Sequence, residues 1–493
     1  MSGDSGLSLP AQGYERVSQL RRVLLNALFL LGAYALPRAF TVAAAVVAAR
    51  VLGVATFGAY GSAAALAVIL SIVATLGMMQ LLVREVARTP RRAPELLGAA
   101  HVAKAGSVVV MMAALLALAA GPLDYGREML QASLLLGLAY AIGAYAENLG
   151  AYFQGIERMG AWLQAQALYG LVFGVLGIVL VLTTRDLVWF CAAPVAGQLV
   201  AVGWLVLRSP PSIRRAWRAP WPLVAQLLRS LAPFAAAFIV LTAYRKVDIL
   251  ILEQWRGTLE AGIYAAAYKF VDLAQALALV IATALYPRLS RLAADRPAAR
   301  GRGERWAAGR AAELLLLAGV PAAGLLWLLR DPFVTLLFGE AYNASTPALG
   351  LLAPALPMLA LNALGTVILA AAGRMRAVAV LYLCALVLNV GLNTMLIPAY
   401  GATGAALATL VSEVTLGAAM LVALRRFAAA APRSRAVVPA VAAGALAVVL
   451  ELAGVGGVVT TGAVYLGIVV VAYVAAGVLT PEERSLLRRA LVG

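Results

Sequence analysis

The 493-residue chain has few charged residues, one histidine and two cysteines, and each scarcity excludes a class of protein. Only 12% of the residues are charged, whereas soluble domains contain roughly 25%. Cys191 and Cys384 both lie in apolar runs, which excludes a disulfide framework and a Cys-x-x-Cys metal site. With His101 as the single histidine, there is no histidine-based acid–base constellation.

Motifs for ATP binding and for hydrolysis are also absent. The sequence contains no GxxxxGK[ST] loop, so it gives no sign of an intrinsic ATP drive. It contains neither HExxH nor GxSxG. We therefore expect a protein that is not an enzyme and that uses no metal or cofactor.

Long hydrophobic runs dominate what is present. The chain is 63% hydrophobic, with a mean hydropathy of +0.92. About 20 apolar residues cross the hydrocarbon core as a helix, and β-barrel alternation is absent. We expect an all-α polytopic membrane protein with about fourteen transmembrane helices, over residues 23–49, 57–82, 99–120, 130–153, 162–182, 187–207, 229–252, 261–286, 310–330, 348–372, 376–396, 403–424, 436–454 and 458–479.

The net charge of +17 is explained by topology. Of the arginines in the connecting segments, 29 fall on one side of the predicted membrane and five on the other. The arginine-rich side is then cytoplasmic, as are both termini, and nucleic-acid binding is not needed to explain the charge. The longest outer segment, 331–347, is too short for the external catalytic domain of a membrane glycosyltransferase or polymerase.

An internal repeat relates the two halves of the chain. "FGAYGSAAAL", from Phe57, matches "AGIYAAAYKF", from Ala261, and in both halves an arginine follows the tyrosine by 24 residues. Six spans separate the copies, so the repeat is parallel, which is common in transporters. We expect a cytoplasmic segment (1–22), a six-helix bundle (23–207), a basic linker (208–228), a second six-helix bundle (229–424), a second linker (425–435), two additional helices (436–480) and a cytoplasmic tail (481–493).

Charged residues inside the spans mark the candidate site. "IVLTAYRKVDILIL", residues 239–252, places three charges in an apolar segment. An ionisable residue at bilayer depth usually faces a cavity or a partner. Spacing of i,i+3 lets Arg245 pair with Asp248 and Lys269 with Asp272. Such pairing leaves two cations over, which an anionic phosphate or pyrophosphate can satisfy.

The candidate substrate-binding residues are Arg38, Arg245, Lys246, Lys269, Tyr60 and Tyr264. Asp248 and Asp272 are candidates for coupling to a proton or sodium ion, or are ion-pair partners only. The remaining polar residues within spans, which serve either interhelical hydrogen bonds or substrate contact, are Glu147, Asn148, Asn389, Asn393, Glu413 and Glu451.

Several segments together resemble a known family. They are "RVLGVATFGAYGSAAAL", "LVREVAR", "YFQGIERM", "DILILEQWRGTLEAGIYAAAYKF", "LLFGEAY" and "LNVGLNTMLIPAYGATGAALAT". Their order and spacing resemble the polysaccharide-export branch of the multidrug/oligosaccharidyl-lipid/polysaccharide exporter superfamily, over nearly the whole chain.

The resemblance implies a flippase of the bacterial cytoplasmic membrane. Its substrate would be an undecaprenyl-diphosphate-linked oligosaccharide, carried to the periplasmic leaflet by alternating access and driven by an ion gradient or the membrane potential. A polysaccharide polymerase is a further expected contact. In related lipid II flippases two extra spans hold the lipid tail, and the sequence leaves open whether residues 436–480 do so.

Three alternatives differ in substrate or class. A cation-coupled multidrug exporter of the same fold often carries a carboxylate in its first span, where this chain has Arg38. A lipid II flippase also has a basic cavity, so the sequence separates it poorly from a glycan flippase. A membrane enzyme such as a ligase or acyltransferase is disfavoured by the short outer segments.

Overall fold

The computed structural model describes residues 37–75, 77–294, 303–427, 434–453 and 457–475, and these residues form helices and turns without any strand. A first helix covers residues 37–52. The others are α2 (Val54–Thr75), α3 (Met78–Arg88), η1 (Pro90–Arg92), α4 (Ala93–Ala120), α5 (Arg127–Gly155), α6 (Met159–Thr184), α7 (Leu187–Arg208), α8 (Pro211–Arg214), α9 (Trp221–Ala294), α10 (Gly303–Leu328), α11 (Arg330–Phe338), η2 (Glu340–Ser345), α12 (Thr346–Leu352), η3 (Ala353–Ala355), α13 (Leu356–Ala371), α14 (Met375–Phe427), α15 (Ser434–Leu452) and α16 (Val458–Ala475).

The helices confirm an all-α polytopic membrane protein. In the described residues, seven helices are long and apolar enough to cross a membrane, or eight if α10 and α11, bent by 74°, form one span. Helices suit such sequences because their backbone groups bond to one another and need no water. The expected run at 23–49 is described only from residue 37 onwards, and the run at 458–479 only as far as 475.

Two very long helices each contain two of the expected spans. α9 is interrupted at Gly257 (φ 82°) and α14 at Gly401 (φ 53°). These φ values lie in the left-handed region, where a side chain is disfavoured and glycine is tolerated. Each glycine therefore reverses the chain at a point where the sequence predicts an outer turn.

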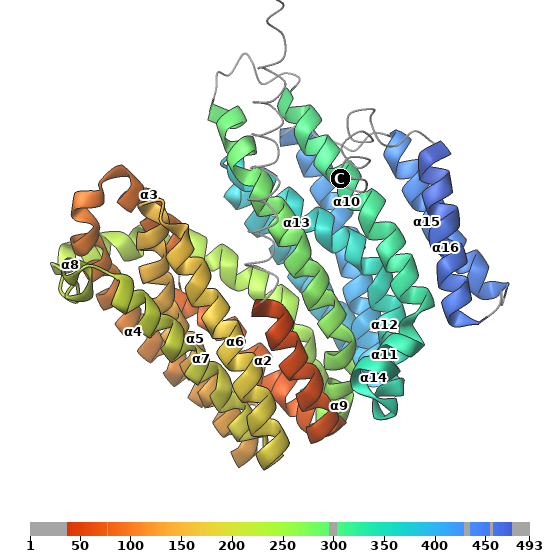
Figure 1. Cartoon of the computed structure of the whole chain (residues 1–493), viewed down its shortest axis with the longest axis horizontal. Coiled ribbons are helices and arrows are strands. Elements are labelled where there is room, and N and C mark those ends of the chain that lie inside the picture. Colours follow the sequence, from red (N-terminus) through yellow and green to blue (C-terminus); the bar gives the residue numbers. More distant parts are fainter. Residues whose placement is uncertain (1–36, 76, 295–302, 428–433, 454–456, 476–493) are drawn as a thin grey trace, which may run out of the picture.

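The helices gather in two groups. Figure 1 shows α2 to α8 on one side and α10 to α14 on the other, with α9 between them and α15 and α16 at the far edge of the second group. The first group is joined by an apolar core that includes Leu97, Leu205 and Val224, and the second by one that includes Leu364, Leu369 and Met420.

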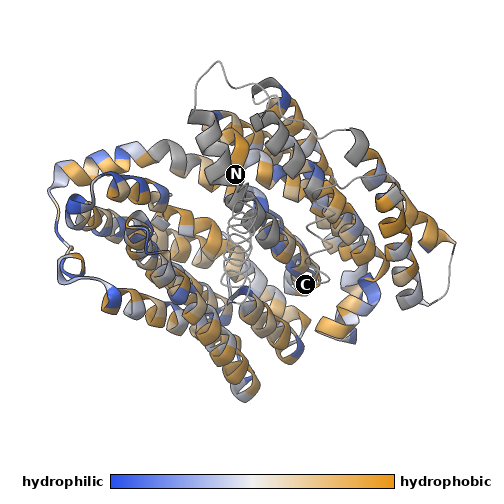
Figure 2. Cartoon of the chain, turned by 45° about the horizontal axis from the view of Figure 1, so that its top comes forward, coloured by the Kyte–Doolittle hydropathy of each residue, from blue (hydrophilic) through white to orange (hydrophobic). Residues whose placement is uncertain are grey.

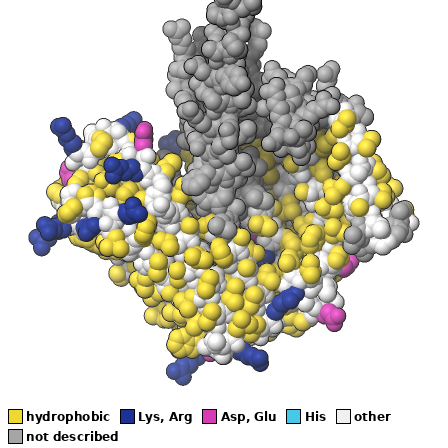
Figure 3. Space-filling model, in the orientation of Figure 1, with side chains coloured by type: hydrophobic (Ala, Val, Ile, Leu, Met, Phe, Trp, Pro, Cys, Tyr) yellow, Lys and Arg dark blue, Asp and Glu magenta, His cyan; other side chains and the backbone are white. Residues whose placement is uncertain are grey.

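The two ends of the bundle differ in charge. We call the end with α3 and α8 the arginine-rich end, and the opposite end, with the turns at Gly257 and Gly401, the arginine-poor end. Figure 3 shows Lys and Arg side chains over α3 and α8 and a broad hydrophobic surface beyond them, and Figure 2 shows hydrophilic residues near several helix ends. Large apolar side chains such as Val109 and Met395 are exposed between the ends, as lipid contact requires.

At the arginine-poor end the two groups meet in a symmetric helix crossing. A Cβ placed on Gly58 of α2 would overlap the carbonyl oxygen of Thr258, and one placed on Gly262 of α9 would overlap that of Val54. Gly58 and Gly262 are the equivalent glycines of the internal repeat, and each meets the residue four positions before the other. The backbones of α2 and α9 are therefore in direct contact at the glycine of the repeated Gly-x-Tyr motif.

Hydrogen bonds reinforce this crossing from both sides. The Arg50 side chain donates to the carbonyl oxygens of Leu336 and Leu337, at 2.8 Å for Leu337, after which α11 ends. At the equivalent position of the repeat, Gln254 Nε2 donates to the carbonyl oxygen of Leu123 at 2.9 Å. Each group thus donates a side-chain hydrogen bond to a backbone carbonyl group of the other. Together with the glycine crossing, these bonds close the arginine-poor end.

The helices outside the repeat, α15 and α16, dock on α10 and on the start of α11. Arg330 forms a two-pronged ion pair with Glu451 of α15, with N–O distances of 2.6 and 2.9 Å. The buried ring of Tyr465 in α16 lies against Gly324 of α10, where there is no side chain to obstruct it. A small apolar cluster around Leu328, Ala447 and Tyr465 completes the contact.

Candidate substrate site

The two arms of α9 carry the charged cluster to the middle of the predicted membrane. Lys246 lies 11 residues before Gly257, and Asp272 lies 15 residues after it. At 1.5 Å per residue these positions are roughly 16 and 22 Å from the turn, near the centre of a core about 30 Å thick. The cluster is therefore at the depth expected for a transporter site.

Asp272 binds two cations. Its Oδ1 accepts a hydrogen bond from Lys246 Nζ at 2.9 Å, and its Oδ2 lies 3.9 Å from Lys269 Nζ. The first contact joins the two arms of α9, and the second is the predicted i,i+3 pair. One carboxylate shared between two ammonium groups leaves this triad with a net charge of +1.

Asp248 is held by hydroxyl and amide donors. It accepts hydrogen bonds from the hydroxyl of Tyr264, from Thr409 Oγ1 at 3.4 Å and from the Ile249 backbone at 2.8 Å. The structure thus shows Asp248 bonded to α14 and to the second arm of α9, and not to Arg245 as i,i+3 spacing predicted. With 3% exposure, Asp248 is enclosed in this conformation, whereas the Asp272 side chain is 34% exposed.

Two further arginines lie at about the depth of the cluster and have no close carboxylate partner among the described residues. No carboxylate of the described residues lies within 4.0 Å of the Arg245 or Arg38 guanidinium. Arg245 is half-buried, with its carbonyl oxygen bonded to the hydroxyl of Tyr268 at 3.0 Å. Arg38 lies at the start of the described chain and is exposed. The Arg245 side chain interacts with the hydroxyl of Tyr382, and no described carboxylate neutralises either arginine at close range.

Tyrosine rings face the lysines of the triad. Lys246 Nζ lies 4.4 Å from the ring centre of Tyr268, and Lys269 Nζ lies 5.7 Å from that of Tyr60 in α2. These cation–π contacts stabilise ammonium groups that are partly removed from water. Tyr60 comes from the other helix group, so its contact with Lys269 also links the two groups at the site.

The structure brings most of the predicted site residues together. Lys246, Lys269, Asp272 and Tyr60 form one set of contacts, and Tyr264 and Asp248 form a second beside it. Sequence reasoning predicted Tyr268 near the cavity without choosing it as a binding residue, and it missed Thr409. Tyr268 had a signal, since it follows Tyr264 by one helical turn, whereas nothing in the sequence pairs Thr409 with Asp248, 161 positions away.

The remaining polar residues in the spans mostly bond to one another. Asn362 Nδ2 donates to Glu413 Oε2 at 2.7 Å, and Asn393 Nδ2 donates to Asn389 Oδ1 at 2.8 Å. Buried Lys104 lies 3.4 Å from Glu147. For these residues and Glu451, hydrogen bonding within the bundle is the observed role.

Two models of known protein families match the sequence of this chain. The family model for polysaccharide biosynthesis proteins matches residues 23–293, more than half of the chain. The chain belongs to the polysaccharide biosynthesis protein family. The MatE family model also matches, over residues 233–395. A search of curated proteins returns no match.

Solved structures with the same fold are transporters. The "lipid II flippase MurJ, inward closed conformation" has a TM-score of 0.68 and 15% identity, over 94% of this chain and 100% of that one. An inward-facing multidrug resistance MATE transporter has a TM-score of 0.64 and 13% identity, over 82% and 98%. A superfamily transporter from Pyrococcus furiosus, described as having a binding pocket of reverse polarity, has a TM-score of 0.59 and 15% identity, over 82% and 94%.

These matches place the chain in the polysaccharide-flippase branch of the multidrug/oligosaccharidyl-lipid/polysaccharide exporter superfamily. The family and the fold are those of transporters. At such low identities the neighbours establish the fold alone, and the roles of individual residues rest on the geometry above.

Proposed function

We propose that this protein carries undecaprenyl-diphosphate-linked oligosaccharide repeat units from the cytoplasmic to the periplasmic leaflet, for the synthesis of a surface polysaccharide. The observation that carries the proposal is the excess of cations at mid-membrane depth. Four cations, Arg38, Arg245, Lys246 and Lys269, lie at this depth with three carboxylates, those of Asp248, Asp272 and Glu413. Neither arginine has a described carboxylate within 4.0 Å. A pyrophosphate supplies the missing negative charge, and guanidinium groups bind it in two-pronged fashion.

The closed arginine-poor end supports alternating access. In this proposal the protein lies in the cytoplasmic membrane of a bacterium, and the arginine-rich end and both termini face the cytoplasm, as the positive-inside rule predicts. The crossing at Gly58 and Gly262 then closes the periplasmic side. Transport requires these contacts to separate and the site to open on the other side. Protonation of Asp272, or its binding of sodium, would alter the net charge of the triad and couple transport to an ion gradient.

A second candidate function is lipid II translocation. Similarity to the lipid II flippase MurJ covers 94% of this chain and so includes residues beyond the two six-helix units. Both substrates are polyprenyl diphosphates, so the same cluster suits either. The two substrates differ in their glycan and in the envelope polymer that is made from it, which is a surface polysaccharide or peptidoglycan.

Deletion of the gene tests the proposal. We expect lipid-linked repeat units to accumulate on the cytoplasmic leaflet, surface polysaccharide to disappear, and the intact gene to restore it. Loss of peptidoglycan synthesis with normal surface polysaccharide would assign the protein to lipid II. Normal envelope polymers with raised sensitivity to cationic drugs would point to a multidrug exporter.

A further inference from the structure

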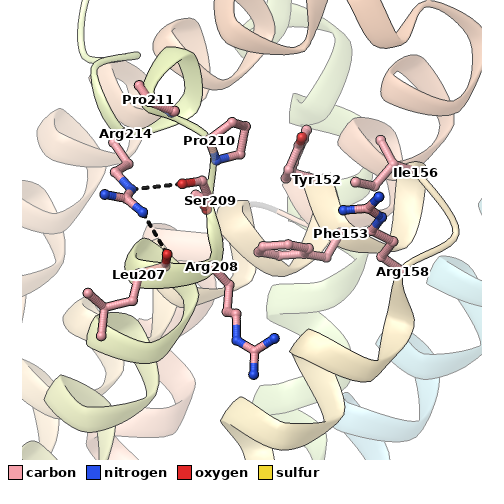
Figure 4. Close-up of a pocket in the computed structure, with 10 residues that line it drawn as sticks. All are labelled: Tyr152, Phe153, Ile156, Arg158, Leu207, Arg208, Ser209, Pro210, Pro211 and Arg214. Carbon is pink, nitrogen blue, oxygen red and sulfur yellow. Dashed lines mark hydrogen bonds between the residues drawn. The ribbon is translucent and has the colours of Figure 1, made fainter.

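A second basic site lies at the arginine-rich end, away from the mid-membrane cluster. A pocket of about 640 Å³ opens there between the turn after α5 and the segment joining α7 to α8. Figure 4 shows its lining, which combines aromatic, aliphatic and proline side chains with arginines. An adjoining pocket of about 330 Å³ shares Phe153, Arg158 and Arg208 and reaches the first turn of α6.

The arginines of this pocket have different roles. Arg214 donates hydrogen bonds to the carbonyl oxygens of Ser209 at 2.7 Å and Leu207 at 2.6 Å (Figure 4). It therefore stabilises the segment between α7 and α8 that forms one side of the pocket. Arg208 lies over the ring of Trp204, at 4.5 Å. No described carboxylate lies within 4.0 Å of the Arg158 or Arg208 guanidinium, and no acidic residue lines either pocket.

The first turn of α6 adds positive charge to the same place. The helix runs for 26 residues, and no side chain caps its start at Met159. A Cβ on Gly160, which lines the smaller pocket, would meet nothing within 4 Å, so the space beside this turn is open. Free amide groups at a helix start attract anions, and phosphate above all.

Apolar side chains border the charged groups. Leu207 is 71% exposed and Met159 is 51% exposed, and both stand at ends of helices that cross the membrane. A free phosphate ion would contact only the arginines and the helix start. A phospholipid would also place its acyl chains along the apolar border, as lipids do at basic pockets on the cytoplasmic side of helices.

We propose that this pocket binds the phosphate headgroup of an anionic membrane phospholipid, with Arg158 and Arg208 donating to the phosphate. The bound lipid would tie the turn after α5 to the α7–α8 segment. The proposal does not rest on the identity of the transported substrate.

Lipid binding to the purified full-length protein tests this. Phosphatidylglycerol, phosphatidylcholine and inorganic phosphate are titrated separately, and binding is followed by native mass spectrometry and by the unfolding temperature. We expect phosphatidylglycerol to bind and stabilise more than the other two. R158Q/R208Q should weaken its binding about tenfold or more, since each arginine contributes a charge-assisted hydrogen bond, and R158K/R208K should weaken it less.

The matched control is R127Q/R185Q, which removes two exposed arginines from the arginine-poor end. It should bind phosphatidylglycerol as the unchanged protein does. Equal binding by R158Q/R208Q and by the control would overturn the proposal, as would equal binding of the two phospholipids. Stabilisation by inorganic phosphate without phosphatidylglycerol binding would also overturn it, as would binding of undecaprenyl diphosphate through the same arginines without phosphatidylglycerol.

Discussion

At the scale of single residues, Asp272 sets the charge balance of the mid-membrane cluster. It is the one carboxylate of the described residues that contacts both Lys246 and Lys269. Asp248, its neighbour in the cluster, is occupied by hydroxyl and amide donors. The two aspartates, which look alike in the sequence, therefore differ in exposure and in partners.

We predict that Asp272→Asn destabilises the protein. Two ammonium groups would remain close together with no carboxylate between them, at a cost of about 1–3 kcal/mol. Thermal unfolding in detergent measures the effect, with Glu128→Gln, at an exposed helix start, as the control. Adding Lys246→Met to Asp272→Asn should recover part of the loss. Equal unfolding temperatures for Asp272→Asn and Glu128→Gln would contradict the shared ion pair.

The sequence predicted which residues gather in the mid-membrane cluster better than it predicted which pairs of them form bonds. Spacing along one helix gave the Lys269–Asp272 pair correctly. It failed for Arg245 and Asp248 because Tyr264 and Thr409 approach Asp248 from other helical segments. Helical periodicity states which side chains share a face, whereas the choice among partners depends on how helices pack.

At the scale of helices, the crossing of α2 and α9 joins the two groups through glycine. Because the backbones touch at Gly58 and Gly262, even one added methyl group must push the helices apart. The contact brings together equivalent positions of the two repeats. This accounts for the glycine of the Gly-x-Tyr pattern in each half.

We predict that Gly58→Ala opens the arginine-poor end. In a variant lacking Cys191 and Cys384, a cysteine at buried Ala265 should react faster with a membrane-impermeant thiol reagent once Gly58→Ala is added. The unfolding free energy should fall by about 1–3 kcal/mol. Gly203→Ala, where a Cβ meets nothing within 4 Å, is the control. Unchanged labelling in Gly58→Ala would show that this crossing does not seal the end.

We also predict that Glu451→Gln loosens α15 and α16 from α10 and the start of α11. The substitution leaves Arg330 without its two-pronged partner while keeping the shape of the side chain. Faster hydrogen exchange in α15 would measure the change, because this pair and one small apolar cluster form much of the observed contact. If exchange in α15 stays the same, the apolar cluster alone holds these helices.

Hydrophobic runs predicted the helices well, including the turns at Gly257 and Gly401, but they missed one bend. The expected spans over 376–396 and 403–424 are the two arms of α14, joined at Gly401. The 74° bend between α10 and α11 had no clear signal, because the apolar residues continue through it. Apolar length predicts that a segment is helical, whereas bends follow from packing and local backbone geometry.

At the scale of the whole molecule, the two helix groups enclose a cationic centre and meet at one end. Reciprocal hydrogen bonds from Arg50 and Gln254 hold that end closed, and the contact of Lys269 with Tyr60 links the groups at the site. In the proposed alternating-access mechanism, the site would open to one side of the membrane at a time. The six-plus-six-plus-two division and its boundaries stay a prediction from the sequence.

The central claim is that the cationic centre moves a pyrophosphate-linked glycan across the membrane. The most direct measurement reconstitutes the protein in vesicles whose undecaprenyl-diphosphate-linked oligosaccharide can be reached by an external glycosidase only after crossing. We predict crossing by the unchanged protein and by Arg185→Ala, a surface control, and at least about tenfold slower crossing by Arg38→Ala and Arg245→Ala at normal folding yield. Equal crossing by all four proteins would contradict the account, as would no crossing by any of them.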